Sequence, residues 1–412
     1  MLRIATIGTS MITDDFIQVV NANDQAAFVG TLSRDANRGA AFTAERGGER
    51  NFTSLDELAT AADVDAVYIG SPNALHYEQA LACIAGGKHV IVEKPFCATE
   101  AQALEVFLAA EAAGVVALEA MRPLHDPAFH AIEDVLSEIA PIRRASLRFG
   151  KYSSRYNEVL AGRATNIFDC NMASGSLMDI GVYAVEPMVE IFGMPSGLTS
   201  MTTLLDPTTR RLTHGPIDGC GSILASYGGG RISVELAHSK ITNDLLPSQI
   251  EGERGTIQID HLSTPRNVRI DYRGDVVCGS ATEAPREQGD NGRVLDLPKS
   301  SNTMEYELTD FITAIGGIDN VKEEIWETPA GCFFYPLLRI SVSAEDDLAV
   351  LRDILNGQVM KCSLKIICFF QNIAGICESF CSNGVDHNSR MGDRIAGTYH
   401  TEFKFIIGKC KR

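Results

Sequence analysis

The stretch that most constrains the fold of this chain is a short buried strand ending in a lysine and a proline. Residues 90–92 are three consecutive β-branched residues, a run typical of a strand buried on both faces. The run stops at Glu93 and Lys94, and Pro95 cannot donate a hydrogen bond to a neighbouring strand. Ligands of open α/β sheets bind beyond the carboxyl ends of the strands, where Lys94 would stand. An isolated Glu-Lys-Pro is also typical of a solvated strand end with an incidental ion pair, so the rest of the chain has to decide.

Length and charge limit the kinds of protein that this chain can be. Its 412 residues are enough for two or three domains. The net charge of -17 argues against nucleic acid and anionic membranes as partners, because both attract basic patches. Residues 2–7 are too short for the apolar core of a signal peptide, and no run reaches the roughly 18 residues of a membrane span. The 11 scattered cysteines, without a Cys-x-x-Cys pair, predict a reduced, cytoplasmic protein with no disulfide framework and no metal site.

Short strands alternate with helical segments over residues 1–122. Two capping boxes, one opening at Ser54 and one at Thr99, mark helix starts between the strands. This alternation predicts an α/β fold, with an N-terminal doubly wound parallel sheet of the Rossmann type. The predicted strands are residues 2–7, 27–32, 66–69, 90–92 and 115–120.

The turn after the first strand is a candidate phosphate-binding loop. A dinucleotide fingerprint has glycines at three positions, Gly-x-Gly-x-x-Gly, so that the backbone can approach a pyrophosphate. Only Gly8 matches, because Ser10 and Thr13 occupy the second and third positions. The motif alone leaves open a turn that binds nothing. In its place between a strand and a helix, we expect its amides and the helix N-terminus to face a phosphate.

The end of the second strand favours NADP over NAD as the cofactor. NAD sites usually carry an acidic residue there, which binds the ribose 2′-hydroxyl. This chain has Ser33 and Arg34 instead, with Arg38 one helical turn further on. A guanidinium group binds phosphate as a planar fork and therefore suits the 2′-phosphate of NADP. The alternative is that Ser33 or Asp35 caps the next helix while Arg34 is merely solvated.

Four landmarks in this order resemble the glucose–fructose oxidoreductase/inositol dehydrogenase family. They are Ile7-Gly8-Thr9-Ser10, Ser71-Pro72-Asn73 with His76, Glu93-Lys94-Pro95, and Asp179-Ile180-Gly181-Val182-Tyr183. The resemblance covers roughly residues 1–355. It implies hydride transfer between a nicotinamide cofactor, NADP or NAD, and the hydroxyl or carbonyl carbon of a sugar, polyol or related diol. It also implies a cis Lys94–Pro95 bond. The expected cofactor-binding residues are Gly8, Thr9, Ser10, Met11, Ile12, Ser33, Arg34, Arg38, Ser71, Pro72, Asn73, His76, Glu93, Lys94 and Arg122.

Lys94 and Tyr183 are the expected proton-transfer pair. Relatives with Asp-x-Gly-x-His use the histidine as the base, and the tyrosine here resembles the dihydrodiol dehydrogenase branch. Burial and a bound nicotinamide would lower the pKa of Lys94, and the ammonium group of Lys94 would lower the pKa of Tyr183. Asp179, four residues earlier at a helix start, would bind a substrate hydroxyl or orient Lys94. The alternative for Asp179 and Tyr183 is a helix cap and a core tyrosine.

The chain changes character after residue 122. Residues 123–356 predict an α+β domain with an open, mostly antiparallel sheet, including strands 222–227 and 231–236 joined by Gly228-Gly229-Gly230. This domain would bind the substrate and join copies of the chain into a homo-oligomer through its sheet. Residues 357–412 carry eight Lys or Arg against four Asp or Glu and five of the cysteines. They resemble nothing in the family and are interpreted as an unassigned tail.

Two other classes of function stay open. The incomplete glycine fingerprint favours a non-catalytic protein that senses a nucleotide, whereas Lys94 and Tyr183 oppose this reading. The other class is a glycosidase or lyase that oxidises its substrate transiently without net redox change.

Overall fold

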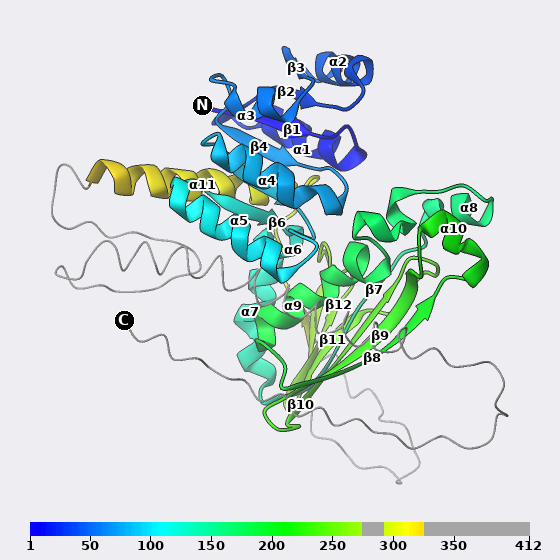
Figure 1. Ribbon diagram of the computed structural model, residues 1–412. Helices are drawn as coiled ribbons and strands as arrows, with labels where there is room; N and C mark the ends of the chain where they lie inside the picture. Colours follow the sequence, from blue (N-terminus) through cyan, green and yellow to red (C-terminus); the bar gives the residue numbers. More distant parts are fainter. Residues whose placement is uncertain (274–291, 325–412) are drawn as a thin grey trace, which may run out of the picture.

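The described part of the chain forms two β-sheets, each with its own helices (Figure 1). The computed structural model describes residues 1–273 and 292–324. The predicted tail at 357–412 lies outside the described residues.

The first sheet has six strands in the order β3-β2-β1-β4-β5-β6, all parallel. The order reverses between β1 and β4, the place where doubly wound sheets bind nucleotides. The predicted Rossmann domain is therefore confirmed. Its elements are β1 (Leu2–Ile7), α1 (Met11–Ala22), β2 (Ala26–Leu32), α2 (Ala36–Glu45), β3 (Arg50–Phe52), α3 (Leu55–Thr60), β4 (Ala66–Ile69), η1 (Asn73–Leu75), α4 (His76–Ala85), β5 (His89–Glu93), α5 (Glu100–Ala113) and β6 (Ala117–Ala120).

Both predicted capping boxes begin helices. The side chain of Ser54 accepts a hydrogen bond from the Glu57 amide at the start of α3, and Thr99 accepts one from the Gln102 amide at the start of α5. Each bond satisfies an amide that has no partner inside its own helix.

The second sheet has eight strands in the order β14-β13-β12-β11-β7-β10-β9-β8. Only β7 and β10 pair in parallel, so the predicted, mostly antiparallel sheet is confirmed. Helices α7 and α9 cover one face of it (Figure 1). The elements are α6 (Arg122–His125), α7 (Pro127–Ile139), β7 (Ile142–Gly150), α8 (Ser154–Leu160), η2 (Asn166–Phe168), η3 (Cys170–Met172), η4, a π-turn (Leu177–Gly181), α9 (Val182–Phe192), β8 (Gly197–Leu204), η5 (Pro207–Thr209), α10 (Arg210–Thr213), β9 (Asp218–Tyr227), β10 (Ile232–Ser239), β11 (Ser248–Gly252), β12 (Gly255–Ile259), β13 (Val268–Tyr272), β14 (Gly292–Val294) and α11 (Met304–Glu324).

Helix α11 returns to the Rossmann sheet after the second sheet is complete (Figure 1). Met304, Leu308 and Phe311 are fully buried there, in one cluster with Phe16 of α1 and Ile91 of β5. The domain bounds 1–122 and 123–356 stay predictions. They assign α11 to the second domain, whereas α11 packs on the first. The Rossmann sheet is thus covered by α1 and α11 on one face and by α3, α4 and α5 on the other.

The described part of the chain lacks two features. No helix in it is both long and apolar enough to cross a membrane. Within the same residues, no group of three or more His, Cys, Asp or Glu side chains could hold a metal ion.

Candidate active site

Lys94, Asp179 and Tyr183 meet where the two domains touch. Lys94 follows β5, whose residues 90–92 are fully buried, and its peptide bond to Pro95 is cis. Its Nζ donates to the main-chain oxygen of Asp179 at 2.7 Å and to Oδ1 of the same residue at 3.2 Å. The same Nζ lies 4.9 Å from the centre of the Tyr183 ring. The structure therefore brings together the three predicted catalytic residues.

The second sheet holds the segment that carries Asp179. Asp218 at the start of β9 accepts a hydrogen bond from the Leu177 amide at 2.6 Å. The hydroxyl of Ser176 lies 2.8 Å from Nδ1 of His238, which comes from β10. Gly181 packs tightly on this strand, since a Cβ there would stand 3.1 Å from the His238 ring and 2.9 Å from Leu177. The Asp-x-Gly-x-Tyr spacing thus fits a turn pressed against a sheet.

Lys240 completes the site and was missed from the sequence. It follows β10, is 9% exposed, and its Nζ forms an ion pair with Oδ2 of Asp179. The Asp179 carboxylate therefore lies between two lysines, with Lys94 on its other oxygen. The only hint in the sequence was that Lys240, like Lys94, stands at the end of a strand, and the predicted strand stopped at residue 236.

The charges at the site differ from those expected. Burial raises the pKa of Asp179, but Lys94 and Lys240 outweigh burial and hold that pKa at about 2. Burial lowers the pKa of Lys94, but Tyr183, Asp179 and Glu93 outweigh it, so the net pKa is raised. Burial also raises the pKa of Tyr183, and Lys94 offsets only part of this. The expectation of lowered pKa values for Lys94 and Tyr183 is therefore wrong for the cofactor-free protein, which holds an ammonium group and a neutral phenol.

The turn after β1 has the geometry of a phosphate loop. Gly8 has φ +109°, and a Cβ there would stand 2.8 Å from the carbonyl oxygen of Gly70, so only glycine fits without strain. Ser10 is the N-cap of α1, where its side chain accepts from the Thr13 amide at 3.4 Å. Thr9 and Ile12 are partly exposed, and Met11 is 85% exposed. The helix N-terminus is thus open to an anion, with a cap where the fingerprint has its second glycine.

Two arginines follow β2: Arg34 lies in the loop after the strand, and Arg38 lies in the first turn of α2. Arg34 is exposed, and Nη2 of Arg38 donates to the carbonyl oxygen of Thr9 at 3.1 Å, which places this guanidinium group beside the phosphate turn. Asp35 caps α2 by accepting from the Arg38 amide, as the alternative reading had it. Ser33 is partly buried and accepts from the Asp35 amide at 3.3 Å. Helix capping by Asp35 leaves both guanidinium groups available to a 2′-phosphate.

The loop after β4 crosses to the second domain. Nδ2 of Asn73 donates to the carbonyl oxygen of Ala173 at 2.8 Å, and Ser71 donates to Gln79. His76 is fully buried, with its ring nitrogens 2.9 Å and 3.0 Å from the carbonyl oxygens of Ser71 and Pro95. In this conformation His76 therefore supports the main chain at Pro95. Contact of His76 with a cofactor stays a prediction, as do the roles of Ser71, Pro72 and Asn73.

The remaining predicted residues, Glu93 and Arg122, lie behind Lys94. Glu93 is 8% exposed and accepts a hydrogen bond from the Tyr68 hydroxyl at 2.7 Å. Burial raises the pKa of Glu93, against the opposing charges of Lys94 and Arg122. Arg122 begins α6, directly after β6. The Glu93 carboxylate therefore faces Tyr68, and its contact with a cofactor stays a prediction.

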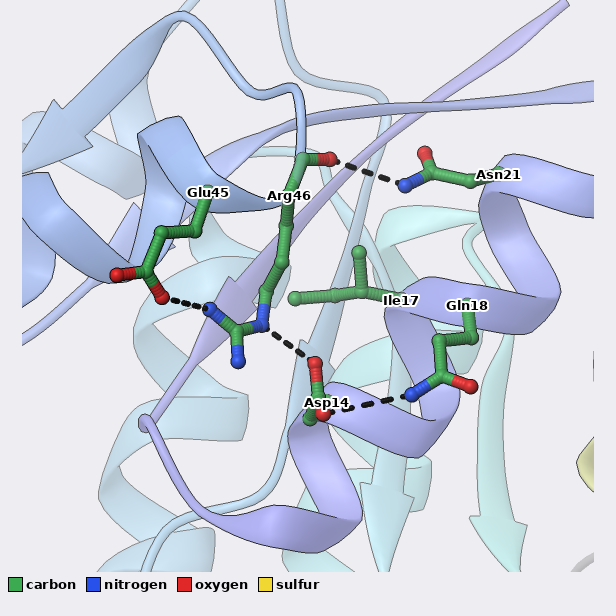
Figure 2. Close-up of a pocket in the computed structure, with 6 residues that line it drawn as sticks. All are labelled: Asp14, Ile17, Gln18, Asn21, Glu45 and Arg46. Atoms are coloured by element: carbon green, nitrogen blue, oxygen red, sulfur yellow. Dashed lines mark hydrogen bonds and ion pairs between the residues drawn. The ribbon is translucent and has the colours of Figure 1, made fainter.

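A surface hollow of ≈ 380 Å³ lies elsewhere, between α1 and α2 (Figure 2). Figure 2 shows that its polar side chains are paired with one another. Arg46 contacts Asp14 at 2.5 Å and Glu45 at 3.2 Å, and Asn21 donates to the carbonyl oxygen of Arg46. None of the predicted site residues lines this hollow, and it offers no group for the chemistry expected at Lys94.

Known proteins resemble this chain in sequence and in fold. Residues 2–120 match the profile of the Gfo/Idh/MocA family, described as an oxidoreductase family with an NAD-binding Rossmann fold. The chain is 37% identical over 317 residues to a scyllo-inositol 2-dehydrogenase (NADP(+)) of Bacillus subtilis, covering 76% of this chain and 88% of that protein. It is 29% identical to a trans-1,2-dihydrobenzene-1,2-diol dehydrogenase of Mus musculus, covering 69% and 80% of the two chains.

Solved structures share the fold. A 3-ketoreductase from Actinomadura kijaniata in complex with NADP and TDP-benzene superposes with a TM-score of 0.66 at 20% identity, covering 89% of this chain and 94% of that one. An aldose-aldose oxidoreductase from Caulobacter crescentus complexed with glycerol gives a TM-score of 0.66 at 16% identity, covering 92% and 98%. At these identities the likeness shows the fold alone.

Proposed function

The chain belongs to the Gfo/Idh/MocA oxidoreductase family, and from this premise we propose that it transfers a hydride between NADP and a carbinol carbon of a sugar, polyol or related diol. The observation that carries the proposal is the meeting of Lys94, Asp179 and Tyr183 at the carboxyl end of β5. The relative of 37% identity is named for scyllo-inositol and NADP(+), which supports a cyclic polyol as the first substrate to test.

The proposed roles follow from the charges at the site. When bound, the nicotinamide supplies the hydride donor or acceptor. With its pKa raised, Tyr183 is a neutral phenol that can donate a proton to a carbonyl oxygen during reduction. The ammonium group of Lys94 stabilises the negative charge that develops on that oxygen. In oxidation the pair has to lose a proton before it accepts the carbinol proton, so oxidation gains from higher pH.

Asp179 and Lys240 are proposed to hold this pair in place. Asp179 fixes Nζ of Lys94 through two oxygens, and Lys240 binds its remaining carboxylate oxygen. A polyol offers further hydroxyl groups beside the reacting carbon. We propose that Asp179 accepts a hydrogen bond from one of them, which favours polyhydric substrates over simple alcohols.

Turnover separates this proposal from the other two classes. The purified protein is mixed with NADP or NAD and a panel of inositols, aldoses and cyclic diols, and the absorbance of the reduced nicotinamide is followed. A steady increase is expected with at least one polyol. A nucleotide sensor would bind cofactor without any change in absorbance. A glycosidase or lyase would form product without net reduction of the cofactor.

Cofactor choice is tested at Arg34. A lost hydrogen bond to a charged group costs about 1.5–3 kcal/mol, so Arg34→Ala is expected to weaken NADP binding about tenfold or more. NAD lacks the 2′-phosphate, and its affinity is expected to stay nearly unchanged. Arg143→Ala, an exposed arginine of the second domain, serves as the control. Equal losses for NADP and NAD would show that Arg34 does not read the 2′-phosphate.

We also propose that copies of the chain associate through the open face of the second sheet. Met201, Leu204 and Leu224 are 79%, 42% and 54% exposed on β8 and β9, where alternate residues face away from the core.

A cytoplasmic location is proposed from the cysteines. In the described part of the chain all four, Cys83, Cys97, Cys170 and Cys220, are free thiols, which suits a reducing compartment.

A further inference from the structure

Two buried glutamates, one from each domain, interact with each other. Glu186 lies in α9, one helical turn after Tyr183, and is 1% exposed. Glu119 lies in β6, next to the strand that ends at Lys94, and is 8% exposed. Glu186 takes no part in the chemistry proposed for Lys94 and Tyr183. Glutamate side chains this deeply buried need a charge or hydrogen-bonding partner.

Glu186 lacks a hydrogen-bond donor. Neither of its carboxylate oxygens has one among the described residues. Its interacting neighbour is the carboxyl group of Glu119. Two adjacent carboxylates in a buried site cannot both be ionised, whereas one proton shared between them makes a hydrogen bond. Burial, reinforced by Glu119, raises the pKa of Glu186 well above its usual range.

Glu119 connects this pair to Lys94. Its Oε1 accepts a hydrogen bond from the main-chain amide of Phe96 at 2.7 Å. Phe96 is fully buried and follows Lys94 and Pro95 directly. A hydrogen bond to its amide therefore helps to fix the main chain that carries Lys94. A hydrogen bond from Glu186 to Glu119 therefore links the helix of Tyr183 to the strand end of Lys94.

We propose that Glu119 and Glu186 share one proton and that this hydrogen bond is a latch that sets the position of Tyr183 relative to Lys94. Glu186 is thus a positioning residue that acts through Glu119 and helix α9. The functional part of this inference rests on the roles proposed for Lys94 and Tyr183, whereas the shared proton itself does not.

The latch depends on pH in a definite direction. The charged groups that act on Glu186 are Glu119 of β6, Lys94 after β5 and Glu190 of α9, and of these only Lys94 favours ionisation. Because folding raises the pKa of Glu186, its contribution to stability is complete below the pKa of an unfolded glutamate and is lost as pH rises through the folded value. The latch is therefore closed while the pair holds its proton and opens as pH rises through the folded value, when the two carboxylates repel each other.

Two substitutions of Glu186 separate a latch from simple packing. Glu186→Leu fills a similar volume without a donor and removes the hydrogen bond to Glu119, so kcat is expected to fall about tenfold or more, with cofactor affinity nearly unchanged. Glu186→Gln keeps a donor at every pH and is expected to recover most of that loss and to remove the part of the alkaline decline that the latch causes. Glu190→Gln, one turn further along the exposed side of α9, is the matched control. Equal losses of kcat in Glu186→Gln and Glu186→Leu would overturn the latch.

The shared proton is measured without turnover. Infrared spectra of the full chain with NADP at neutral pH are expected to show a protonated carboxyl band that disappears in Glu186→Gln and persists in Glu190→Gln. The difference between spectra is needed because burial also raises the pKa of Glu307 to about 8, so that this residue contributes a band of its own. If Glu186→Gln removes no band, the pair holds no proton and the inference is wrong, whether or not the protein turns over a polyol.

Discussion

Single residues decide the chemistry of this site through charge. Lys94 is placed by its strand, but its pKa is set by Asp179, Tyr183 and Glu93, which come from both domains. Burial raises the pKa of Tyr183 and keeps its hydroxyl protonated, although the charge of Lys94 opposes this. Both side chains therefore carry their protons at neutral pH.

The proton-transfer pair predicts a specific pattern of kinetics. General acid–base groups contribute about 10²–10⁴ in rate, so Tyr183→Phe and Lys94→Met are each expected to lower kcat by a factor in that range. The double variant is expected to lose far less than the product of the two factors, because the residues act as a unit. NADP affinity, measured by titration, is the control for Tyr183→Phe and is expected to change little. If Tyr183→Phe keeps nearly full turnover, the tyrosine is a core residue.

Lys240 is predicted to contribute to activity, but less than Lys94 and Tyr183 do. Lys240→Met removes one of the two cations that lower the pKa of Asp179, so that pKa is expected to rise. The acid side of the pH–activity profile then moves to higher pH. By the usual cost of a lost charged hydrogen bond, kcat/KM at neutral pH is expected to fall roughly tenfold to a hundredfold. Lys240→Arg, which keeps the charge, is the matched control. An unchanged profile in Lys240→Met would show that Lys94 alone holds Asp179.

At the scale of elements, the site depends on a segment that is not an ordinary helix. Residues 177–181 form a π-turn held by Asp218 and His238 from two neighbouring strands. Such turns are rare and occur often at functional sites. The α9 helix that follows presents Tyr183 and Glu186 on one side, three residues apart.

Helix α11 is predicted to stabilise the Rossmann domain. Phe311 is fully buried against Phe16 and Ile91, so Phe311→Ala is expected to lower the free energy of unfolding by about 3–5 kcal/mol. Thr313→Ala, exposed on the same helix, is expected to stay within about 0.5 kcal/mol of the parent protein. Urea unfolding measures both. A loss below about 1 kcal/mol for Phe311→Ala would mean that the domain closes its core without α11.

At the scale of the whole molecule, the open face of the second sheet predicts an oligomer. Light scattering after size-exclusion chromatography is expected to give a mass above that of one chain. Leu224→Glu places a charge on that face and is expected to shift the mass toward a monomer, because burying an unpaired carboxylate is costly. Leu108→Glu on α5, at a similarly exposed position of the Rossmann domain, is the control. A wild-type protein that is monomeric at all concentrations, or a Leu224→Glu variant with unchanged mass, would exclude this face as the interface.

The sequence by itself predicted the order of strands and helices in the Rossmann domain, although β3 (Arg50–Phe52) was absent from the predicted strands. The apolar run at 90–92 predicted a strand buried on both faces, and Val90 and Val92 indeed face one core cluster while Ile91 faces another. The caps at Ser54 and Thr99 predicted helix starts for the same reason, because each depends on residues within one turn. The positions of Lys94, Asp179 and Tyr183 followed from the family pattern.

The tertiary structure alone decided which distant residues meet. Lys240 lies 61 residues from Asp179 in the chain, and nothing near either residue in the sequence reveals their ion pair. His76 is fully buried, and Phe311 covers the face of β5 that Ile91 presents, although it stands far along the chain. The pKa values of Lys94 and Tyr183 rose where the sequence predicted a fall, because burial and the sum of neighbouring charges exist only once both domains have folded against each other.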